Sequence, residues 1–259
     1  MITKFEIHLV PAETKYFRMY SGAFVRGFLY WVLRRISREF ASKLHSDRHL
    51  APFATSPVFK GNEVANRLEE GEKYRFFITT FIEEIGEALK DYFISMDKLF
   101  FAGDYQEAER VEVEYVCESE LKNDAKSKKF KINFITPCYL RTPSQGYRFV
   151  PLPIPQLLFR SLARLWEAFV KPLPSGYRDW LDEWGVVVSG CSIATEKVLL
   201  RRQTWSVGFK GEVSFSIPDD SYVEKFAKTT ATLLNFGKYS NVGGGRTSGL
   251  GVIDYSLLF

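Results

Sequence analysis

The sequence predicts an α+β protein made of tandem ferredoxin-like domains, each with the element order β-α-β-β-α-β. A length of 259 residues is sufficient for two domains. Apolar residues alternate in some segments, as in strands, and recur with helical spacing in others. The same order of these segments occurs twice along the chain. A charged connector separates the two runs, and the hydrophobic content of 46% is typical of a folded globular protein.

The N-terminal domain is expected at residues 1–120. Its first strand is indicated by Phe5, Ile7 and Leu9, which alternate with polar residues. A helix is then expected over 22–44, strands near 54–59 and 74–80, a helix over 82–93 and a strand over 111–115. The side of the first helix that should pack on the sheet carries Phe28, Leu29, Val32, Leu33, Ile36, Phe40 and Leu44.

The C-terminal domain is expected at residues 130–259, after an exposed connector over 118–129 that is rich in charged residues. The same order of elements follows. Strands are expected over 130–135, 186–200, 207–217 and 250–255, and helices over 156–170 and 222–236. Because the ferredoxin-like fold carries many unrelated activities, this pattern alone implies no function.

The most distinctive local pattern is N-V-G-G-G-R-T-S-G-L-G at residues 241–251, before the last predicted strand. Glycines allow positive φ and close approach of a phosphate, and the same segment adds a cation and two hydroxyls. It is neither a Walker loop nor a dinucleotide fingerprint. It is either a cradle for a sugar-phosphate backbone or a sharp turn that needs small residues. The candidate RNA-binding residues are Gly243, Gly244, Gly245, Arg246, Thr247, Ser248, Gly249 and Gly251.

Charge and cysteine content limit the kinds of partner and site that this chain can have. The net charge of +4 suits a polyanionic partner without requiring one. Three cysteines without a C-x-x-C pair indicate neither a disulfide framework nor a thiolate zinc site, which is typical of a reducing, cytosolic setting. No apolar run is long enough for a membrane span, and the N-terminus reads as a strand. A cytoplasmic protein with no membrane partner is therefore expected.

Only three histidines are present, and they differ in context. His8 shares the polar side of the first strand with Glu6 and is expected to be solvated or structurally paired. His45 and His49 are spaced i, i+4, but no third ligand accompanies them, so proton transfer is a better use than metal binding. On one continuous helix, Arg34, Arg38 and His45 would fall within roughly 40° of one another. Alternatively, the helix ends before Leu44 and His45 lies in the following loop.

These patterns resemble the CRISPR-associated endoribonucleases that cut precursor CRISPR RNA within its repeats, a family of the repeat-associated mysterious protein (RAMP) superfamily. The C-terminal loop of that family reads G-x-G, five residues, G-x-G. Here Gly249 and Gly251 form the second pair, Gly243 has the right spacing, and Asn241 replaces the first glycine. The stretches F-I-T-P at 134–137 and F-K-G-E-V-S-F at 209–215 also match.

The resemblance implies an RRM-like RAMP fold and an enzyme that needs no metal or cofactor. In that family the ribose 2′-OH attacks the adjacent phosphorus and leaves a 2′,3′-cyclic phosphate and a 5′-OH. Members that cut RNA commonly carry a histidine in or after the first helix, a place matched by His45, with His49 as the substitute. The remaining catalytic candidates are Tyr30, Lys43 and Arg48, and the further RNA-binding candidates are Arg34 and Arg38.

The expected partner is CRISPR repeat RNA, and both a homodimer and association with other CRISPR effector subunits are left open. A non-catalytic RAMP subunit that binds CRISPR RNA within a larger complex is the leading alternative. It would keep the glycine loop and have no need of His45. A third possibility is an unrelated ferredoxin-like binding module, for which the loop would be accidental.

Overall fold

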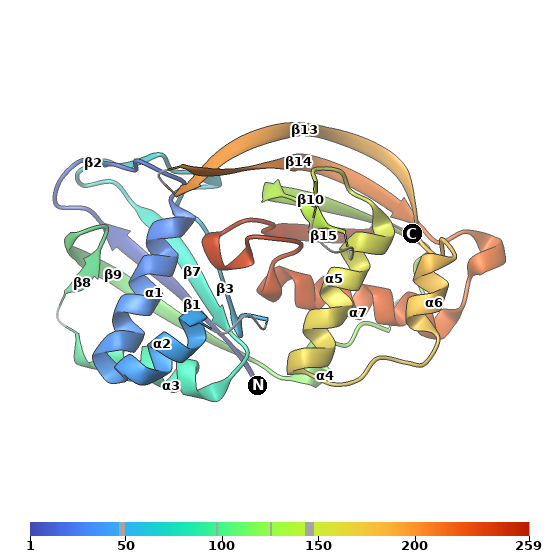
Figure 1. The fold of residues 1–259 in the computed structure, drawn as a ribbon, viewed down its shortest axis with the longest axis horizontal. Coiled ribbons are helices and arrows are strands. Elements are labelled where there is room, and N and C mark those ends of the chain that lie inside the picture. Colours follow the sequence, from blue (N-terminus) through green and yellow to red (C-terminus); the bar gives the residue numbers. More distant parts are fainter. Residues whose placement is uncertain (47–49, 97, 125, 143–147, 202, 259) are drawn as a thin grey trace. The chain divides into compact units, whose positions relative to one another are not determined.

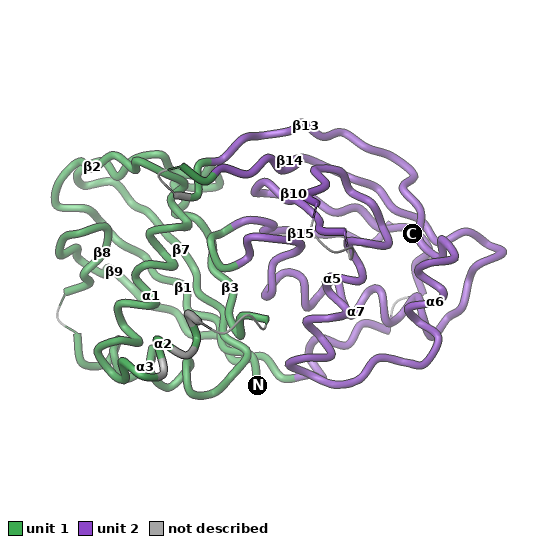
Figure 2. The backbone as a smooth tube through the Cα atoms, viewed as in Figure 1, with its two compact units in different colours: residues 1–117, 199–204, 247–249 green, residues 118–198, 205–246, 250–259 purple. Residues whose placement is uncertain are grey.

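The computed structural model describes residues 1–46, 50–96, 98–124, 126–142, 148–201 and 203–258 (Figure 1). The chain forms two compact units, which are coloured separately in Figure 2. The N-terminal unit comprises Met1–Cys117, Leu199–Thr204 and Thr247–Gly249. The C-terminal unit comprises Glu118–Val198, Trp205–Arg246 and Leu250–Phe259. None of the helices within the described ranges is long and apolar enough to cross a membrane.

The N-terminal unit is built on a sheet with the order β5-β4-β7-β1-β9-β8, and β3 also pairs with β7. Its principal strands are β1 (Ile2–Val10), β3 (Phe53–Thr55), β7 (Tyr74–Thr80) and β9 (Asp104–Val116). Its helices are α1 (Gly22–Ile36), α2 (Arg38–Ser46) and α3 (Glu83–Ser95). Shorter strands are β2 (Lys15–Tyr16), β4 (Phe59–Lys60), β5 (Glu63–Val64), β6 (Arg67–Leu68) and β8 (Leu99–Phe101). With β1 between β9 and β7, and β3 beside β7, the unit has the predicted ferredoxin-like order.

Alternation along β1 explains how this sheet acquires a core on one face. Phe5, Ile7 and Leu9 are fully buried. They pack in one hydrophobic cluster with buried residues of α1, among them Phe28 and Leu29. The polar residues between them lie on the opposite face, because successive side chains of a strand point to opposite sides. The predicted first strand and most of the predicted packing side of the helix are confirmed.

The single helix expected over 22–44 is wrong, because the chain leaves helical geometry at Ser37, with φ −150° and ψ 112°. The Ser37 carbonyl accepts a hydrogen bond from the Ala41 N–H at 3.1 Å, which makes Ser37 the N-cap of α2. Serine is among the favoured N-cap residues. Ile36, expected on the packing side, is instead 54% exposed at the end of α1. The alternative is correct that the first helix ends before Leu44, but it is wrong in placing His45 in a loop, since α2 extends to Ser46.

The C-terminal unit has a four-stranded sheet with the order β13-β14-β10-β15. Its strands are β10 (Lys129–Cys138), β13 (Val187–Arg201), β14 (Thr204–Ser216) and β15 (Ile253–Leu258). The helices are α4 (Glu118–Leu121), α5 (Pro155–Phe169), α6 (Tyr177–Asp182) and α7 (Glu224–Ser240). A separate two-stranded hairpin is formed by β11 (Leu140–Arg141) and β12 (Phe149–Val150). Each predicted helix and strand of this half is present, and its strand order is again ferredoxin-like.

Aromatic side chains form the centre of this unit. The Phe130 and Phe215 rings stack at 5.6 Å, and Phe159 of α5 meets both edge-on. The connector is only partly as expected, because it forms α4 and buries Leu121. The Leu121 carbonyl accepts a hydrogen bond from Asn235 Nδ2 at 3.1 Å, so this segment is tied to α7 rather than solvated throughout.

Candidate functional site

The α2 segment carries the predicted catalytic histidine. The backbone of Lys43 and His45 lies in α2, and the side chains of both residues are outside the described part of the structure. Arg48 and His49 lie outside the described residues altogether. The structure therefore places the His45 backbone in the last turn of α2, and the catalytic role of the histidine stays a prediction.

Tyr30, a second catalytic candidate, connects α1 to the end of α2. Its hydroxyl donates to the Leu44 carbonyl at 3.5 Å, one residue before His45. The ring is buried, with Phe53 edge-on at 5.9 Å and the Arg26 guanidinium 5.6 Å from its centroid. The bond to the Leu44 carbonyl therefore links the C-terminal turn of α2 to α1, next to the backbone of His45.

The two arginines predicted to bind RNA beside His45 are both exposed. Arg34 lies in the last turn of α1, whereas Arg38 is the first residue of α2. The shared face predicted for Arg34, Arg38 and His45 assumed one continuous helix. The break at Ser37 removes that geometric argument, and RNA binding by the two arginines stays a prediction based on charge and exposure.

The glycine loop after α7 folds back on itself through its backbone. The Val242 N–H donates to the Gly251 carbonyl at 2.8 Å, and the Gly251 N–H donates to the Pro137 carbonyl at 3.0 Å. The Gly244 N–H donates to the Tyr139 carbonyl at 2.8 Å. The two ends of the loop are thus closed onto each other and attached to the end of β10.

Close packing against the protein backbone explains why several positions of the loop are glycine. Gly243, Gly249 and Gly251 have φ values of 76°, 80° and 70°, a region that disfavours other residues. An added Cβ would lie 2.4 Å from the Tyr139 carbonyl oxygen at Gly243 and 1.9 Å from the Val242 carbonyl oxygen at Gly251. At Gly249 it would lie 2.5 Å from a backbone nitrogen of the N-terminal unit. Gly243 and Gly251 are therefore required by the fold of the loop itself, and Gly249 by close packing within the N-terminal unit.

The partly exposed positions of the loop are Gly243, Gly245 and Thr247. Gly244 is buried against the Tyr139 ring, and the remaining candidate positions, Ser248 among them, are buried as well. Binding of an RNA backbone stays a prediction, and it now centres on these three positions rather than on every residue of the pattern.

Arg246, expected to contact a phosphate, is only 7% exposed. Its Nη1 donates to the Ser240 carbonyl at 3.0 Å, at the end of α7. Burial lowers the pKa of Arg246 to about 9, and the charge of Arg164 contributes, so the guanidinium is still protonated at neutral pH. In this position the cation holds the loop to the helix that precedes it.

We expect Arg246→Ala to lower the free energy of unfolding by about 1–3 kcal/mol, since it removes the partner of a buried carbonyl. Urea denaturation followed by circular dichroism measures this change. Arg178→Ala is the matched control, because Arg178 is an exposed arginine of the same unit that pairs with Glu167 on the surface, and it should change stability by less than about 1 kcal/mol. Unchanged stability of Arg246→Ala together with weakened RNA binding would instead favour the phosphate contact predicted from the sequence.

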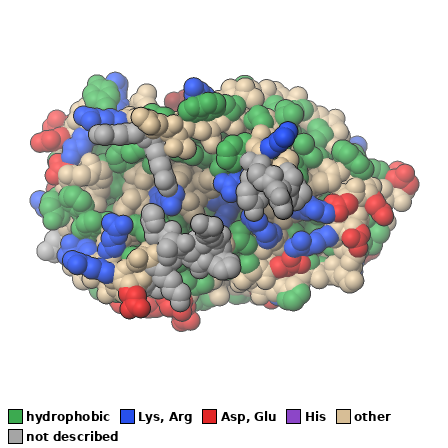
Figure 3. Space-filling view, viewed as in Figure 1, with side chains coloured by type: hydrophobic (Ala, Val, Ile, Leu, Met, Phe, Trp, Pro, Cys, Tyr) green, Lys and Arg blue, Asp and Glu red, His purple; other side chains and the backbone are tan. Residues whose placement is uncertain are grey.

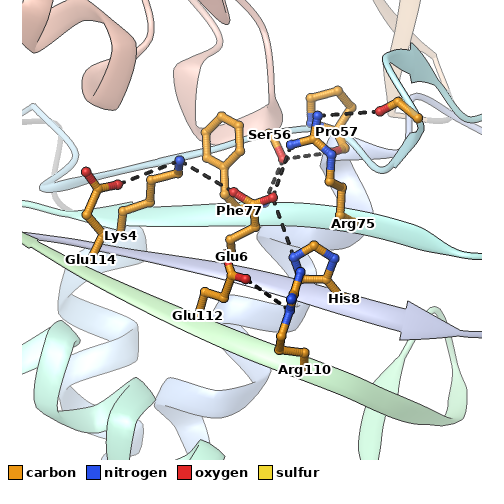
Figure 4. Close-up of polar contacts among 11 residues, drawn as sticks. Lys4, Glu6, His8, Ser56, Pro57, Arg75, Phe77, Arg110, Glu112 and Glu114 are labelled. Carbon is orange, nitrogen blue, oxygen red and sulfur yellow. Dashed lines mark hydrogen bonds and ion pairs between the residues drawn. The ribbon is translucent and has the colours of Figure 1, made fainter.

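His8 lies in a network of charged residues on the polar, partly buried face of β1, shown in Figure 4. Its Nε2 is 3.6 Å from Glu6 Oε1, an oxygen that also accepts a hydrogen bond from Arg75 Nη1 at 3.1 Å. The structural role expected for His8 fits this pairing. Among the described residues, no three His, Cys, Asp or Glu side chains are grouped so that they could hold a metal ion.

Sequence reasoning missed the residues that hold the loop in place. Ser161 of α5 accepts a hydrogen bond from the Gly243 N–H at 3.4 Å, and Asn241 donates from Nδ2 to the Arg246 carbonyl at 3.2 Å. Asn241 has φ 54°, which fits its substitution for a glycine. Gly22, at the start of α1, faces Ser248, whose carbonyl oxygen would be 2.1 Å from an added Cβ. Only the asparagine carried a signal in the sequence.

Comparison with known sequences finds one family model that matches part of the chain. Residues 132–253, which contain the whole glycine loop, match the sequence model described as CRISPR-associated endoribonuclease Cas6. The chain resembles the Cas6 endoribonucleases. This match confirms the resemblance predicted from the loop. No curated protein sequence matches the chain.

Solved Cas6 structures have the same fold over nearly the whole chain. A product complex of a Thermus thermophilus Cas6 (TTHB231) has a TM-score of 0.81 at 22% identity, covering 99% of this chain and 100% of that chain. A Cas6 (TTHA0078) product complex has a TM-score of 0.75 at 23% identity, with the same coverage of both chains. A structure described as a RAMP protein binding different RNA substrates has a TM-score of 0.65 at 11% identity, covering 98% of this chain and 99% of that chain. The predicted fold class, tandem ferredoxin-like domains of the RAMP type, is thereby confirmed.

Proposed function

We propose that this chain is an endoribonuclease that cleaves CRISPR repeat RNA and produces mature guide RNA. The observation that carries the proposal is the match of residues 132–253 to the Cas6 family, because that segment includes the closed glycine loop. The similar Cas6 structures include product complexes and a substrate-mimic complex, which supports RNA as the substrate. In the space-filling view of Figure 3, Lys and Arg side chains gather on part of the surface of the C-terminal unit, whereas acidic side chains lie at the right-hand end of the view.

In the proposed reaction the ribose 2′-OH attacks the adjacent phosphorus, and the bond to the 5′-oxygen of the next nucleotide breaks. A base accepts the proton of the 2′-OH, an acid donates a proton to the leaving 5′-oxygen, and cations stabilise the charge that develops on phosphorus. The products are a 2′,3′-cyclic phosphate and a 5′-OH. Because the nucleophile belongs to the ribose, RNA is cut and DNA is not.

His45 is the proposed base or acid, because imidazole exchanges protons near neutral pH. One of the similar Cas6 (TTHA0078) structures is a variant with a histidine replaced by alanine, which supports the choice of a histidine as the candidate. Tyr30 is proposed to position the helix that carries His45, on the strength of its bond to the Leu44 carbonyl. His49, Lys43 and Arg48 are proposed for the remaining proton-transfer and charge-stabilising roles.

We expect synthetic CRISPR repeat RNA to be cleaved at the same rate in EDTA as in magnesium. The proposed chemistry takes its nucleophile from the ribose and its proton transfers from side chains, so that no step requires a metal ion. Gel electrophoresis of labelled repeats, with a ribonuclease that depends on magnesium as the control, measures this. Activity that is lost in EDTA and restored by magnesium or manganese would contradict the mechanism.

The same experiment separates cleavage from the leading alternative, a non-catalytic RAMP subunit of a CRISPR effector complex. Such a subunit would bind repeat RNA through the loop and leave it intact under every condition. A cytoplasmic location, a homodimer and further CRISPR subunits as partners stay predictions.

A further inference from the structure

A short hairpin next to the glycine loop presents an exposed aromatic ring beside a cation. The hairpin pairs β11 with β12, and its register places Arg141 directly opposite Phe149. The Thr142 N–H donates to the Arg148 carbonyl at 3.2 Å, and the Arg148 N–H donates to Thr142 Oγ1 at 3.3 Å. Because directly opposed residues of an antiparallel pair lie on the same face, Arg141 and Phe149 are held side by side.

The ring and the guanidinium are already arranged for stacking. Phe149 is 55% exposed, although it is a large apolar residue. The Arg141 guanidinium lies 5.6 Å from the centroid of the Phe149 ring and 5.7 Å from that of Tyr139. Arg141 Nη2 also donates to the Tyr139 hydroxyl at 3.3 Å, and the Phe149 and Tyr139 rings meet edge-on at 4.8 Å. The buried Tyr139 thus orients both exposed groups.

Tyr139 also links this pair to the glycine loop. Its carbonyl accepts the hydrogen bond from the Gly244 N–H, and a Cβ on Gly244 would lie 2.1 Å from its ring. The loop therefore rests on Tyr139, and Phe149 contacts the same ring. All of these residues belong to the C-terminal unit, so their arrangement is internal to that unit.

We propose that Phe149 and Arg141 form a stacking site for one unpaired nucleobase of the RNA whose backbone the loop binds. The inference rests on the proposed function and extends it from the backbone to a base. Every nucleobase has a face that stacks on aromatic rings and guanidinium planes, whereas an apolar protein partner would gain nothing from the two exposed arginines of the hairpin. The site recognises an unstacked base regardless of its identity.

The proposal is tested by measuring the affinity for repeat RNA by fluorescence anisotropy. The RNA carries 2′-fluoro riboses, so that it lacks the attacking hydroxyl and is not cut. Phe149→Ala should weaken binding by about 5- to 150-fold, the range for losing one stacked base. Since no phosphate contact is removed, the dependence of affinity on salt should keep its slope. Phe149→Trp should bind as the wild type does. The control is Trp184→Ala, which removes another exposed aromatic of the same unit, just after α6, and should bind normally.

A series of repeats, each with one abasic nucleotide, identifies the base. At one position of the repeat, the abasic nucleotide should weaken binding to the wild type but should not weaken binding to Phe149→Ala any further, because the nucleotide and the variant each remove the same contact. Additive losses at every position, or wild-type affinity of Phe149→Ala, would overturn the stacking site and leave the proposed function intact. Failure of the wild-type chain to bind any repeat RNA would overturn both.

Discussion

His45→Ala should lower the single-turnover rate of repeat RNA cleavage by about 10²- to 10⁴-fold and leave RNA affinity nearly unchanged. That range is typical of losing one general acid or base, and a group that acts only in the transition state contributes little to binding of the ground state. Rapid mixing of excess enzyme with labelled repeat measures the rate, and anisotropy measures the affinity.

His8→Ala is the matched control for this prediction, because His8 lies in a network of charged residues on β1 and has no proposed part in the reaction. It should cleave at the wild-type rate. His49→Ala should have a smaller effect than His45→Ala. The reverse order of these two would exchange the roles of the histidines, and wild-type rates for both would indicate that cleavage depends on positioning without a histidine.

Gly251→Ala should lower the free energy of unfolding by about 2–5 kcal/mol. A left-handed φ of 70° costs a residue other than glycine about 1–2 kcal/mol, and overpacking costs about 1–3 kcal/mol more. The added Cβ would lie 1.9 Å from the Val242 carbonyl oxygen, so the hydrogen bond that closes the loop must shift. Urea denaturation followed by tryptophan fluorescence measures the loss.

Gly176 provides a control within the same unit, because it has a similar φ of 82° but its nearest neighbour is a ring atom at an ordinary 3.5 Å. Gly176→Ala should therefore lose only the conformational part, about 1–2 kcal/mol. The difference between the two variants isolates the cost of close packing in the loop. Equal losses would show that the loop is not packed as described.

The fold could be predicted from the sequence wherever the hydrophobic period was clear. The alternation of Phe5, Ile7 and Leu9 and the helical pattern over 156–170 gave the correct elements, because burial of one face determines both periods. The break at Ser37 was missed, since the apolar period continues across it and only the capping geometry of a single serine ends α1. Local capping of this kind competes with the longer pattern and leaves a weak signal.

The candidate site was predictable in its composition but not in its contacts. The spacing of the loop glycines identified the segment and the resemblance to the Cas6 endoribonucleases. The burial of Arg246 could not be foreseen, because an arginine in a glycine-rich loop is ordinarily exposed. The stacking pair of Arg141 and Phe149 also left no signal, since it depends on the register of a hairpin with two-residue strands. Both features depend on contacts between segments that are distant in the sequence, and the hydrophobic period does not predict such contacts.

Attack by the ribose 2′-OH is tested most directly by changing one atom of the substrate. After the cleavage position of a repeat has been mapped, the nucleotide that supplies the nucleophile is replaced by its 2′-deoxy form, and both RNAs are incubated with the wild-type chain in EDTA. The all-ribose repeat should be cut to a product whose mass shows a 2′,3′-cyclic phosphate, and the deoxy repeat should be bound equally well and remain intact. Cleavage of the deoxy repeat, or a product ending in a 3′-OH, would contradict the mechanism, and binding without cleavage of any repeat would assign the chain to the non-catalytic RAMP subunits.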